Sequence, residues 1–174
     1  MTEQSRTPPK SDMDNVICEL GLSDLTAVLS LNNENAVETS VLDESGLAAL
    51  LGMAFYARGM GRGGTAFLIA LDQSAPYRNP NFEWFKARRE SFVYIDRVIV
   101  AGSARGKGLA RRLYEDLFAA ANNSGHTCVV CEVNVDPPNH ASDAFHQAMG
   151  FAIVGQAIIH NGSKTVSYFE KNLT

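Results

Sequence analysis

The stretch FVYIDRVIVAGSARGKGLARRLYEDLFAAA, residues 92–121, decides the fold of this chain. An apolar run typical of a buried strand leads into a glycine-spaced turn, and an amphipathic helix follows directly. Gly106 and Gly108 let the backbone come close to a ligand, Arg105 and Lys107 stand beside them, and the helix offers its amino terminus to an anion. This arrangement predicts a site for a pyrophosphate group.

Two common phosphate-binding loops do not fit these residues. A Walker loop needs four residues between its glycines and a hydroxyl after the lysine, but only three separate Gly102 from Gly106, and Gly108 occupies the hydroxyl position. A dinucleotide-binding turn needs a third small residue where this chain has Arg111. The sequence therefore disfavours a protein that uses this turn to bind ATP or a dinucleotide.

The pattern Arg105-x-x-Gly108-x-Ala110 resembles the acyl-CoA loop of the GNAT superfamily of N-acetyltransferases. A second set of residues keeps the order and offsets that the superfamily shows after its next strand: Asn139, Ser142, Phe145, His146, Gly150 and Phe151. The resemblance extends over residues 16–171 and is strongest from 92 to 151. It implies the fold, acetyl-CoA as the cofactor, and an N-acetyltransferase activity.

Periodicity places the elements of an α/β (α+β) fold, with a mixed, mostly antiparallel seven-stranded sheet and helices on both faces. We expect strands at residues 16–20, 53–58, 65–71, 92–100, 127–133, 151–160 and 165–171. We expect four main helices at 24–31, 44–51, 108–122 and 142–149, and a short one near 84–89. Gly-rich residues 59–64 and the pair Asn161-Gly162 are predicted hairpin turns.

The resemblance also implies which residues meet the cofactor. Strands 92–100 and 127–133 would run parallel and splay apart, so that backbone donors near 98–100 bond the pantetheine arm and polarise the acetyl carbonyl. The implied cofactor contacts are Val98, Ile99, Val100, Arg105, Gly106, Lys107, Gly108, Leu109, Ala110, Arg111, Asn139, Ser142 and Phe145. Asn139 and Ser142 equally suit a helix start that needs capping side chains.

Direct transfer of an acetyl group from a thioester to an amine needs a base for the amine and an acid for the departing thiolate. Glu132 is the leading base candidate, because it stands in an otherwise apolar strand where a raised pKa is expected, and because some superfamily members carry a catalytic Glu there. Asp96 is the second candidate, and an ion pair with a nearby arginine would explain it equally well.

His146 is the candidate acid. It stands seven residues after Asn139, where the superfamily usually has a tyrosine whose hydroxyl protonates the thiolate. Because histidine titrates near pH 6.5 and tyrosine near 10, this change predicts a different pH dependence. The alternative is a helix histidine that packs or hydrogen-bonds locally.

The acceptor site is expected in the variable segments. Residues 75–85 concentrate aromatic side chains in a long connection, and a polar cluster stands at 32–35. The substrate-binding candidates are Asn33, Tyr77, Trp84 and Tyr94. A hydrophobic cluster that anchors the connection, and ordinary polar turn chemistry, are the alternatives. The resemblance implies that the acceptor is a primary amine of a small molecule or of a protein or peptide. A non-catalytic CoA-binding module is the rival function.

Composition agrees with a single acetyltransferase domain at residues 15–174 after a disordered leader at 1–14. With 45% hydrophobic and 20% charged residues the chain can form a core, and its net charge of -4 gives no general attraction to nucleic acid. No apolar run approaches the roughly 18–20 residues of a membrane span. We expect a cytoplasmic protein without a membrane or nucleic-acid partner, and a homodimer is compatible with the pattern.

Three cysteines and four histidines raise the question of a metal site. Cys128 and Cys131 stand three residues apart in a predicted strand, so their side chains point to opposite faces and do not converge on one ion. The sequence therefore predicts no metal.

Overall fold

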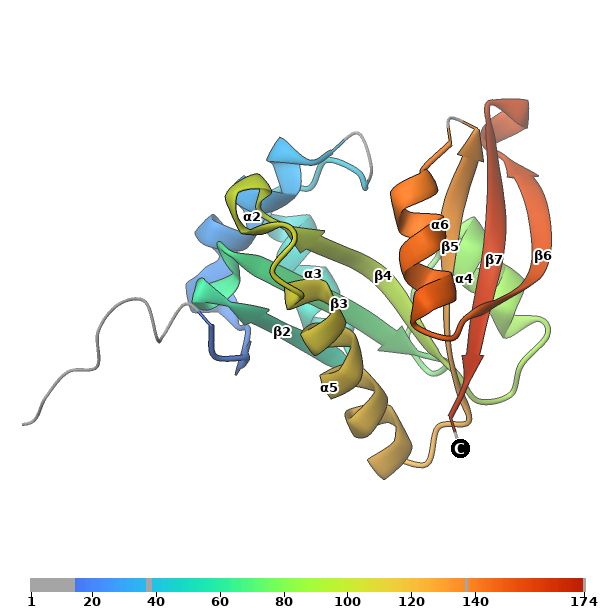
Figure 1. Ribbon diagram of the computed structural model, residues 1–174, viewed down its shortest axis with the longest axis horizontal. Helices are drawn as coiled ribbons and strands as arrows, with labels where there is room; N and C mark the ends of the chain where they lie inside the picture. The colour runs from blue at the N-terminus through green and yellow to red at the C-terminus, as the bar shows by residue number, and fades with distance from the viewer. Residues whose placement is uncertain (1–14, 37–38, 137, 174) are drawn as a thin grey trace, which may run out of the picture. The chain divides into compact units, whose positions relative to one another are not determined.

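The computed structural model describes residues 15–36, 39–136 and 138–173 (Figure 1). The predicted leader at 1–14 lies outside these residues. The strands are β1 (Cys18–Glu19), β2 (Tyr56–Met60), β3 (Ala66–Asp72), β4 (Val93–Val100), β5 (Cys128–Asp136), β6 (Ala152–Ile159) and β7 (Lys164–Asn172). The α-helices are α2 (Leu25–Glu34), α3 (Glu44–Met53), α4 (Pro80–Lys86), α5 (Leu109–Asn123) and α6 (His140–Ala148).

The seven strands form one sheet in the order β1-β2-β3-β4-β5-β7-β6. β4 and β5 pair in parallel, whereas β1 with β2, β5 with β7, and β6 with β7 pair antiparallel. The predicted α+β fold with a mixed, mostly antiparallel sheet is therefore confirmed. No helix in the described part of the chain combines the length and the apolar character that a membrane span requires.

Several predicted boundaries differ from the structure by up to four residues, among them those around α3 and α4. Met53 is the last residue of α3 and does not begin a strand. The short helix starts at Pro80, four residues before the predicted Trp84, because the Asn79 side chain accepts hydrogen bonds from the backbone N–H groups of the first turn, including that of Asn81 at 2.8 Å. Proline at the first helical position fits this start, since it has no N–H to satisfy there.

Contacts divide the chain into two compact units, and the single-domain organisation stays a prediction. The first unit comprises the described residues between 15 and 52, residues 57–68 and residues 98–113. Its glycine-dense turn has positive φ at Arg62 (54°) and Gly63 (86°). A Cβ atom on Gly63 would lie 2.5 Å from the Val28 side chain, so this position requires glycine. The Arg62 guanidinium pairs with buried Asp24 at 2.7 Å and holds the turn against the start of α2.

The second unit comprises residues 53–56, 69–97 and 114 onward. Within it, α6 lies in front of β5 and β7 in Figure 1 and α4 lies behind them. Side-chain contacts agree, because Tyr168 of β7 packs on Trp84 and Phe85 of α4, whereas its neighbour Phe169 packs on His146 of α6. Strand β7 therefore presents alternate residues to two different helices.

Candidate functional site

Glu132 lies on the α4 face of β5. It is directly opposite Tyr168 in the β5–β7 ladder, and Tyr168 packs on α4. Glu132 as a whole is partly exposed, but its Oε2 atom is buried and has no hydrogen-bond partner. No other buried side-chain nitrogen or oxygen in the described ranges lacks a partner. A buried polar atom without a partner is costly, and such atoms in native proteins commonly have a functional reason.

The surroundings of Glu132 raise its pKa to about 7. Burial is the main cause, since it disfavours the charged carboxylate, and the negative charge of Asp96 adds to it. Hydrogen bonds from Tyr94 and Asn81 act in the opposite direction and lower this pKa. A carboxyl group that titrates near neutral pH is suited to take up and release a proton.

Asp96 lies on β4 with both carboxylate oxygens engaged. Oδ1 accepts a hydrogen bond from the Tyr77 hydroxyl at 2.5 Å, and Oδ2 is 2.7 Å from the Nε atom of Arg97. The side chains of Asp96 and Arg97 are 3% and 6% exposed. Asp96 thus has the arginine partner that the alternative interpretation expected, and its charge acts on Glu132 from within a paired cluster.

His146 lies on the other side of the sheet, on the buried face of α6, where its ring packs on Phe169 of β7. Its Nδ1 is 2.7 Å from the carbonyl oxygen of Ser142, which can only accept, so Nδ1 carries the proton. Nε2 is 2.9 Å from the Tyr114 hydroxyl, which then donates to it. Burial lowers the pKa of His146, while the carbonyl of Ser142 acts to raise it. Both ring nitrogens are occupied in the neutral form.

Asn139 and Ser142 stand at the start of α6. The Asn139 side chain accepts a hydrogen bond from the backbone N–H of Ser142 at 3.1 Å, which is the capping role that the sequence suggested. The ring of Phe145 contacts Tyr114 edge-on, with centroids 5.0 Å apart. Contacts of these three residues with a cofactor stay predictions.

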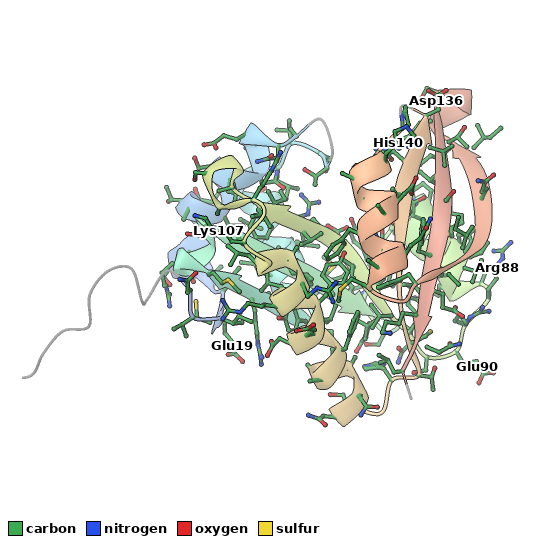
Figure 2. The ribbon with its side chains drawn as sticks, in the orientation of Figure 1. Glu19, Arg88, Glu90, Lys107, Asp136 and His140 are labelled. Atoms are coloured by element: carbon green, nitrogen blue, oxygen red, sulfur yellow. The ribbon has the colours of Figure 1, made fainter. Side chains whose placement is uncertain are left out.

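The turn at residues 105–110 has the backbone expected of an anion cradle. Gly106 and Gly108 have φ of 74° and 75°, and a Cβ on either would meet nothing within 4 Å. Glycine is therefore needed here for conformation, and the space beside the turn is open. In the described part of the chain, no hydrogen bond from the backbone amides of residues 106–110 is found. Figure 2 shows Lys107 at this turn, just before α5.

The Arg105 side chain anchors the turn within its own unit. Its Nη2 atom donates to the Asn35 side chain at 3.0 Å, and its Nε atom donates to the carbonyl of Val100 at 3.4 Å. Arg105 therefore ties the turn to the end of β4, and its contact with the cofactor stays a prediction. Leu109 is buried and Ala110 partly buried at the first turn of α5, and Arg111 is exposed.

The strands that the resemblance places around the pantetheine arm are parallel, as predicted. Their ladder consists of two residue pairs, Val93 with Val129 and Tyr94 with Val130, near the beginning of β4 and β5. Farther along β4, Ile99 is buried and Val98 and Val100 are partly exposed. Backbone contacts of these three residues with a cofactor stay predictions.

The four predicted substrate-binding residues have different surroundings. Asn33 exchanges hydrogen bonds with the backbone N–H and carbonyl of Leu42, at 3.1 and 3.0 Å, and thereby holds the segment after α2. Trp84 stacks on Tyr168 with centroids 4.1 Å apart, and the Arg88 guanidinium lies 4.1 Å over its ring. Figure 2 labels Arg88, which follows α4. These contacts are those of packing residues.

Tyr77 and Tyr94 belong to the carboxylate cluster instead. The Tyr77 hydroxyl donates a hydrogen bond to Asp96, and Tyr94 acts on the Glu132 carboxyl as a hydrogen-bond donor that lowers its pKa. Burial, followed by the charges of Glu132 and Asp96, raises the pKa of Tyr94 well above its ordinary value. Both phenols therefore stay protonated and serve as donors at neutral pH.

Sequence reasoning missed three residues that touch the candidate groups. Asn81 and Tyr168 lie beside Glu132, and Tyr114 bonds His146. The pattern Asn79-Pro80 was a readable helix-start signal that would have put Asn81 on the first turn of α4. Nothing local in the sequence pairs Tyr168 with Glu132 or Tyr114 with His146. Within the described ranges, no three His, Cys, Asp or Glu side chains are grouped so that they could hold a metal ion.

Comparison with known families decides what this architecture is. The sequence matches the acetyltransferase (GNAT) family over residues 49–151, which include the glycine turn, Glu132 and His146. The chain belongs to the acetyltransferase (GNAT) family. It is an acetyl-CoA-dependent N-acetyltransferase, as the resemblance predicted.

Solved structures share the fold of this acetyltransferase at low sequence identity. Ard1 from Thermoplasma volcanium is 14% identical with a TM-score of 0.72, and the match covers 91% of this chain and 97% of that one. The ribosomal-protein-alanine N-acetyltransferase from Brucella melitensis is 21% identical with a TM-score of 0.68, covering 91% and 99%. The putative acetyltransferase yncA from Salmonella typhimurium, determined with acetyl-CoA, is 19% identical with a TM-score of 0.67, covering 91% and 94%. No curated protein matches the sequence.

Proposed function

We propose that Glu132 is the general base of this N-acetyltransferase and that its Oε2 atom receives the proton of the acceptor amine. The observation that carries the proposal is that Oε2 is buried without a hydrogen-bond partner. An incoming amine would supply the missing donor. The pKa near 7 keeps a large fraction of the carboxyl ionised at neutral pH and still basic enough to accept a proton.

In the proposed reaction the amine nitrogen attacks the thioester carbonyl carbon while Glu132 takes up its proton. The tetrahedral intermediate collapses, the carbon–sulfur bond breaks, and CoA leaves as the thiolate. Asp96 is less suited to be the base, since both of its carboxylate oxygens already accept from Tyr77 and Arg97. Its charge instead helps to raise the pKa of Glu132.

His146 as proton donor to the thiolate stays a prediction, and its surroundings favour a structural role. Direct donation requires a protonated imidazole with a nitrogen free to reach sulfur. Here Nδ1 bonds the Ser142 carbonyl, Nε2 bonds the Tyr114 hydroxyl, and burial lowers the pKa of the ring. We therefore assign the local hydrogen-bonding role to His146.

We further propose that the turn at residues 105–110 binds the pyrophosphate of acetyl-CoA through its backbone amides. Five consecutive amides, at 106–110, donate no hydrogen bond within the described residues, and the space beside both glycines is open. Lys107 adds a positive charge. The helix that begins at Leu109 contributes the positive end of its dipole.

Calorimetric titration of CoA into Gly108→Val tests this turn. The φ of 75° is unfavourable for a β-branched residue, so the turn should change shape, and CoA affinity should fall by about tenfold or more. Gly102→Ala is the matched control, because Gly102 does not have a positive φ and an added Cβ there meets nothing within 4 Å. Equal affinity in both variants would remove the turn from the cofactor site.

The acceptor is proposed to be a primary amine of a small molecule or of a protein or peptide. A broad panel of amines and peptides with measured acetyl-CoA consumption tests it, and peptides that begin with alanine belong in the panel because two similar structures are ribosomal-protein-alanine N-acetyltransferases. Turnover of one member that Glu132→Gln abolishes supports the base. Turnover that this variant leaves unchanged moves the base to another residue. The homodimer stays a prediction, which light scattering of the purified protein tests.

A further inference from the structure

Asn81 is a buried polar residue on the first turn of α4. Only 5% of its surface is exposed, and its backbone N–H bonds the cap residue Asn79 at 2.8 Å. A side-chain amide at such a position needs partners for both its oxygen and its nitrogen, because an unpaired buried amide is destabilising. Its partners determine what the residue does.

The oxygen of this amide accepts a hydrogen bond from Tyr168. The distance from the Tyr168 hydroxyl to Asn81 Oδ1 is 3.0 Å, which leaves the NH2 group to be directed elsewhere. Tyr168 itself is held in place, since Trp84 stacks on its ring at 4.1 Å and Phe85 contacts it edge-on at 5.2 Å. The orientation of the Asn81 amide is therefore set by a rigid aromatic partner.

The register of the sheet brings this pair of residues to Glu132. Glu132 is the cross-strand neighbour of Tyr168, which bonds Asn81, and the Asn81 side chain acts on the Glu132 carboxyl as a hydrogen-bond donor that lowers its pKa. Tyr94 approaches the same carboxyl from β4. Held in this way, the carboxyl keeps Oε2 without a partner.

We propose that Asn81 is a positioning residue for the reaction, which orients the Glu132 carboxyl so that Oε2 stays available to the acceptor amine, and that Tyr168 holds Asn81 in this orientation. This inference rests on the proposed role of Glu132 as the base. Asn81 does not touch the reacting atoms, and it acts through the carboxyl group that does.

The pH dependence of kcat/KM tests this role, because a purely structural residue does not move it. Asn81→Leu removes the donor at similar size, so kcat/KM should fall about tenfold, and the acidic limb of the profile should move to higher pH by up to about one unit. The limb moves upward because the Asn81 hydrogen bond lowers the pKa of Glu132. The KM for acetyl-CoA should stay unchanged.

Three companion variants keep the test decisive. Asn81→Asp retains an oxygen for Tyr168 and adds a negative charge beside Glu132, so the limb should move farther upward. Tyr168→Phe removes only the hydroxyl and should give a smaller shift in the same direction. Asn79→Ala removes the α4 cap and leaves the Asn81 amide in place, so it should lower Tm without moving the limb.

The outcomes separate the two proposals. If the acidic limb of the kcat/KM profile does not move in Asn81→Leu and Asn81→Asp, the positioning role of Asn81 is overturned. If Glu132→Gln also loses turnover, the role of Glu132 as the base is kept. Turnover that survives in Glu132→Gln overturns the base itself. If Asn81→Leu does not fold, Asn81→Asp and Tyr168→Phe give the same readout.

Discussion

Two titratable residues on opposite sides of the β5–β7 ladder, Glu132 of β5 and His146 of α6, are in opposite situations. On the α4 face, Glu132 has a buried carboxylate oxygen without a partner and a pKa raised to about 7. On the α6 face, His146 has both ring nitrogens bonded, to Ser142 and Tyr114, and a pKa that burial lowers. The sequence made both residues candidates for proton transfer. Their surroundings show that only Glu132 is left with an unused proton-accepting atom.

This difference teaches that burial alone does not mark a reactive group. Burial disfavours the charged form of both residues, which raises the pKa of the acid and lowers that of the base. The two residues differ in their hydrogen bonds. The protein supplies partners for both ring nitrogens of His146 but none for Oε2 of Glu132. A buried atom without a partner calls for an explanation, of which a catalytic role is one, whereas a fully bonded group is typical of the scaffold.

The largest effect is expected from Glu132→Gln, which keeps the shape of the side chain and removes the base. We expect kcat/KM to fall by about 100- to 10,000-fold, the usual contribution of a general base. Steady-state rates with the best acceptor from the amine panel measure it. Glu83→Gln, which changes an exposed carboxyl on α4, should leave the rate unchanged. If Glu132→Gln and Glu83→Gln had the same kcat/KM, Glu132 would not be the base.

The second effect concerns stability. The folded pKa of Glu132 is about 7 against an ordinary 4.5, so the native state binds more protons than the unfolded state between these values, and stability declines as pH rises through this window. Glu132→Gln removes this decline. The unfolding free energy of the variant minus that of the wild type should therefore be higher at pH 8 than at pH 4.5 by on the order of 3 kcal/mol. Urea unfolding at the two pH values measures it, and an equal effect of the substitution at both would contradict the raised pKa.

A smaller effect is expected from His146→Phe. The Tyr114 hydroxyl would lose its acceptor inside the protein, so unfolding free energy should fall by about 1–3 kcal/mol while kcat stays within about threefold. Combining it with Tyr114→Phe should recover part of the loss, because replacing both partners by apolar groups is less costly than removing one. A kcat that drops 100-fold in a folded His146→Phe protein would restore the histidine as the acid.

The smallest effect is expected from Tyr94→Phe. The Tyr94 hydroxyl lowers the pKa of Glu132 through a hydrogen bond, so its removal should move the acidic limb of the kcat/KM profile upward by about half a unit to one unit. The rate profile between pH 5 and 9 measures the shift. If the acidic limb of the Tyr94→Phe profile moved to lower pH instead, the hydrogen bond from Tyr94 would not be what lowers the pKa of Glu132.

Much of the fold was predictable because its signals are local. The β4–turn–α5 stretch combines an apolar run, glycines and an amphipathic helix, and the structure places positive φ at Gly106 and Gly108. Glu132 stood out because a carboxylate is rare in a buried strand. The start of α4 was misplaced, although Asn79 and Pro80 carry a capping signal, and with it the position of Asn81 was missed.

By itself, the sequence determined the order of the elements, the acetyl-CoA-dependent family and the short set of groups that could move protons. These follow from periodicity and from motifs within a few residues, which depend on local backbone geometry. Only the tertiary structure decided which groups are free to act. Register placed Tyr168 opposite Glu132, and helix packing joined Tyr114 to His146, 32 residues away. Hydrogen-bond satisfaction depends on distant neighbours, so it emerges only when the chain is packed.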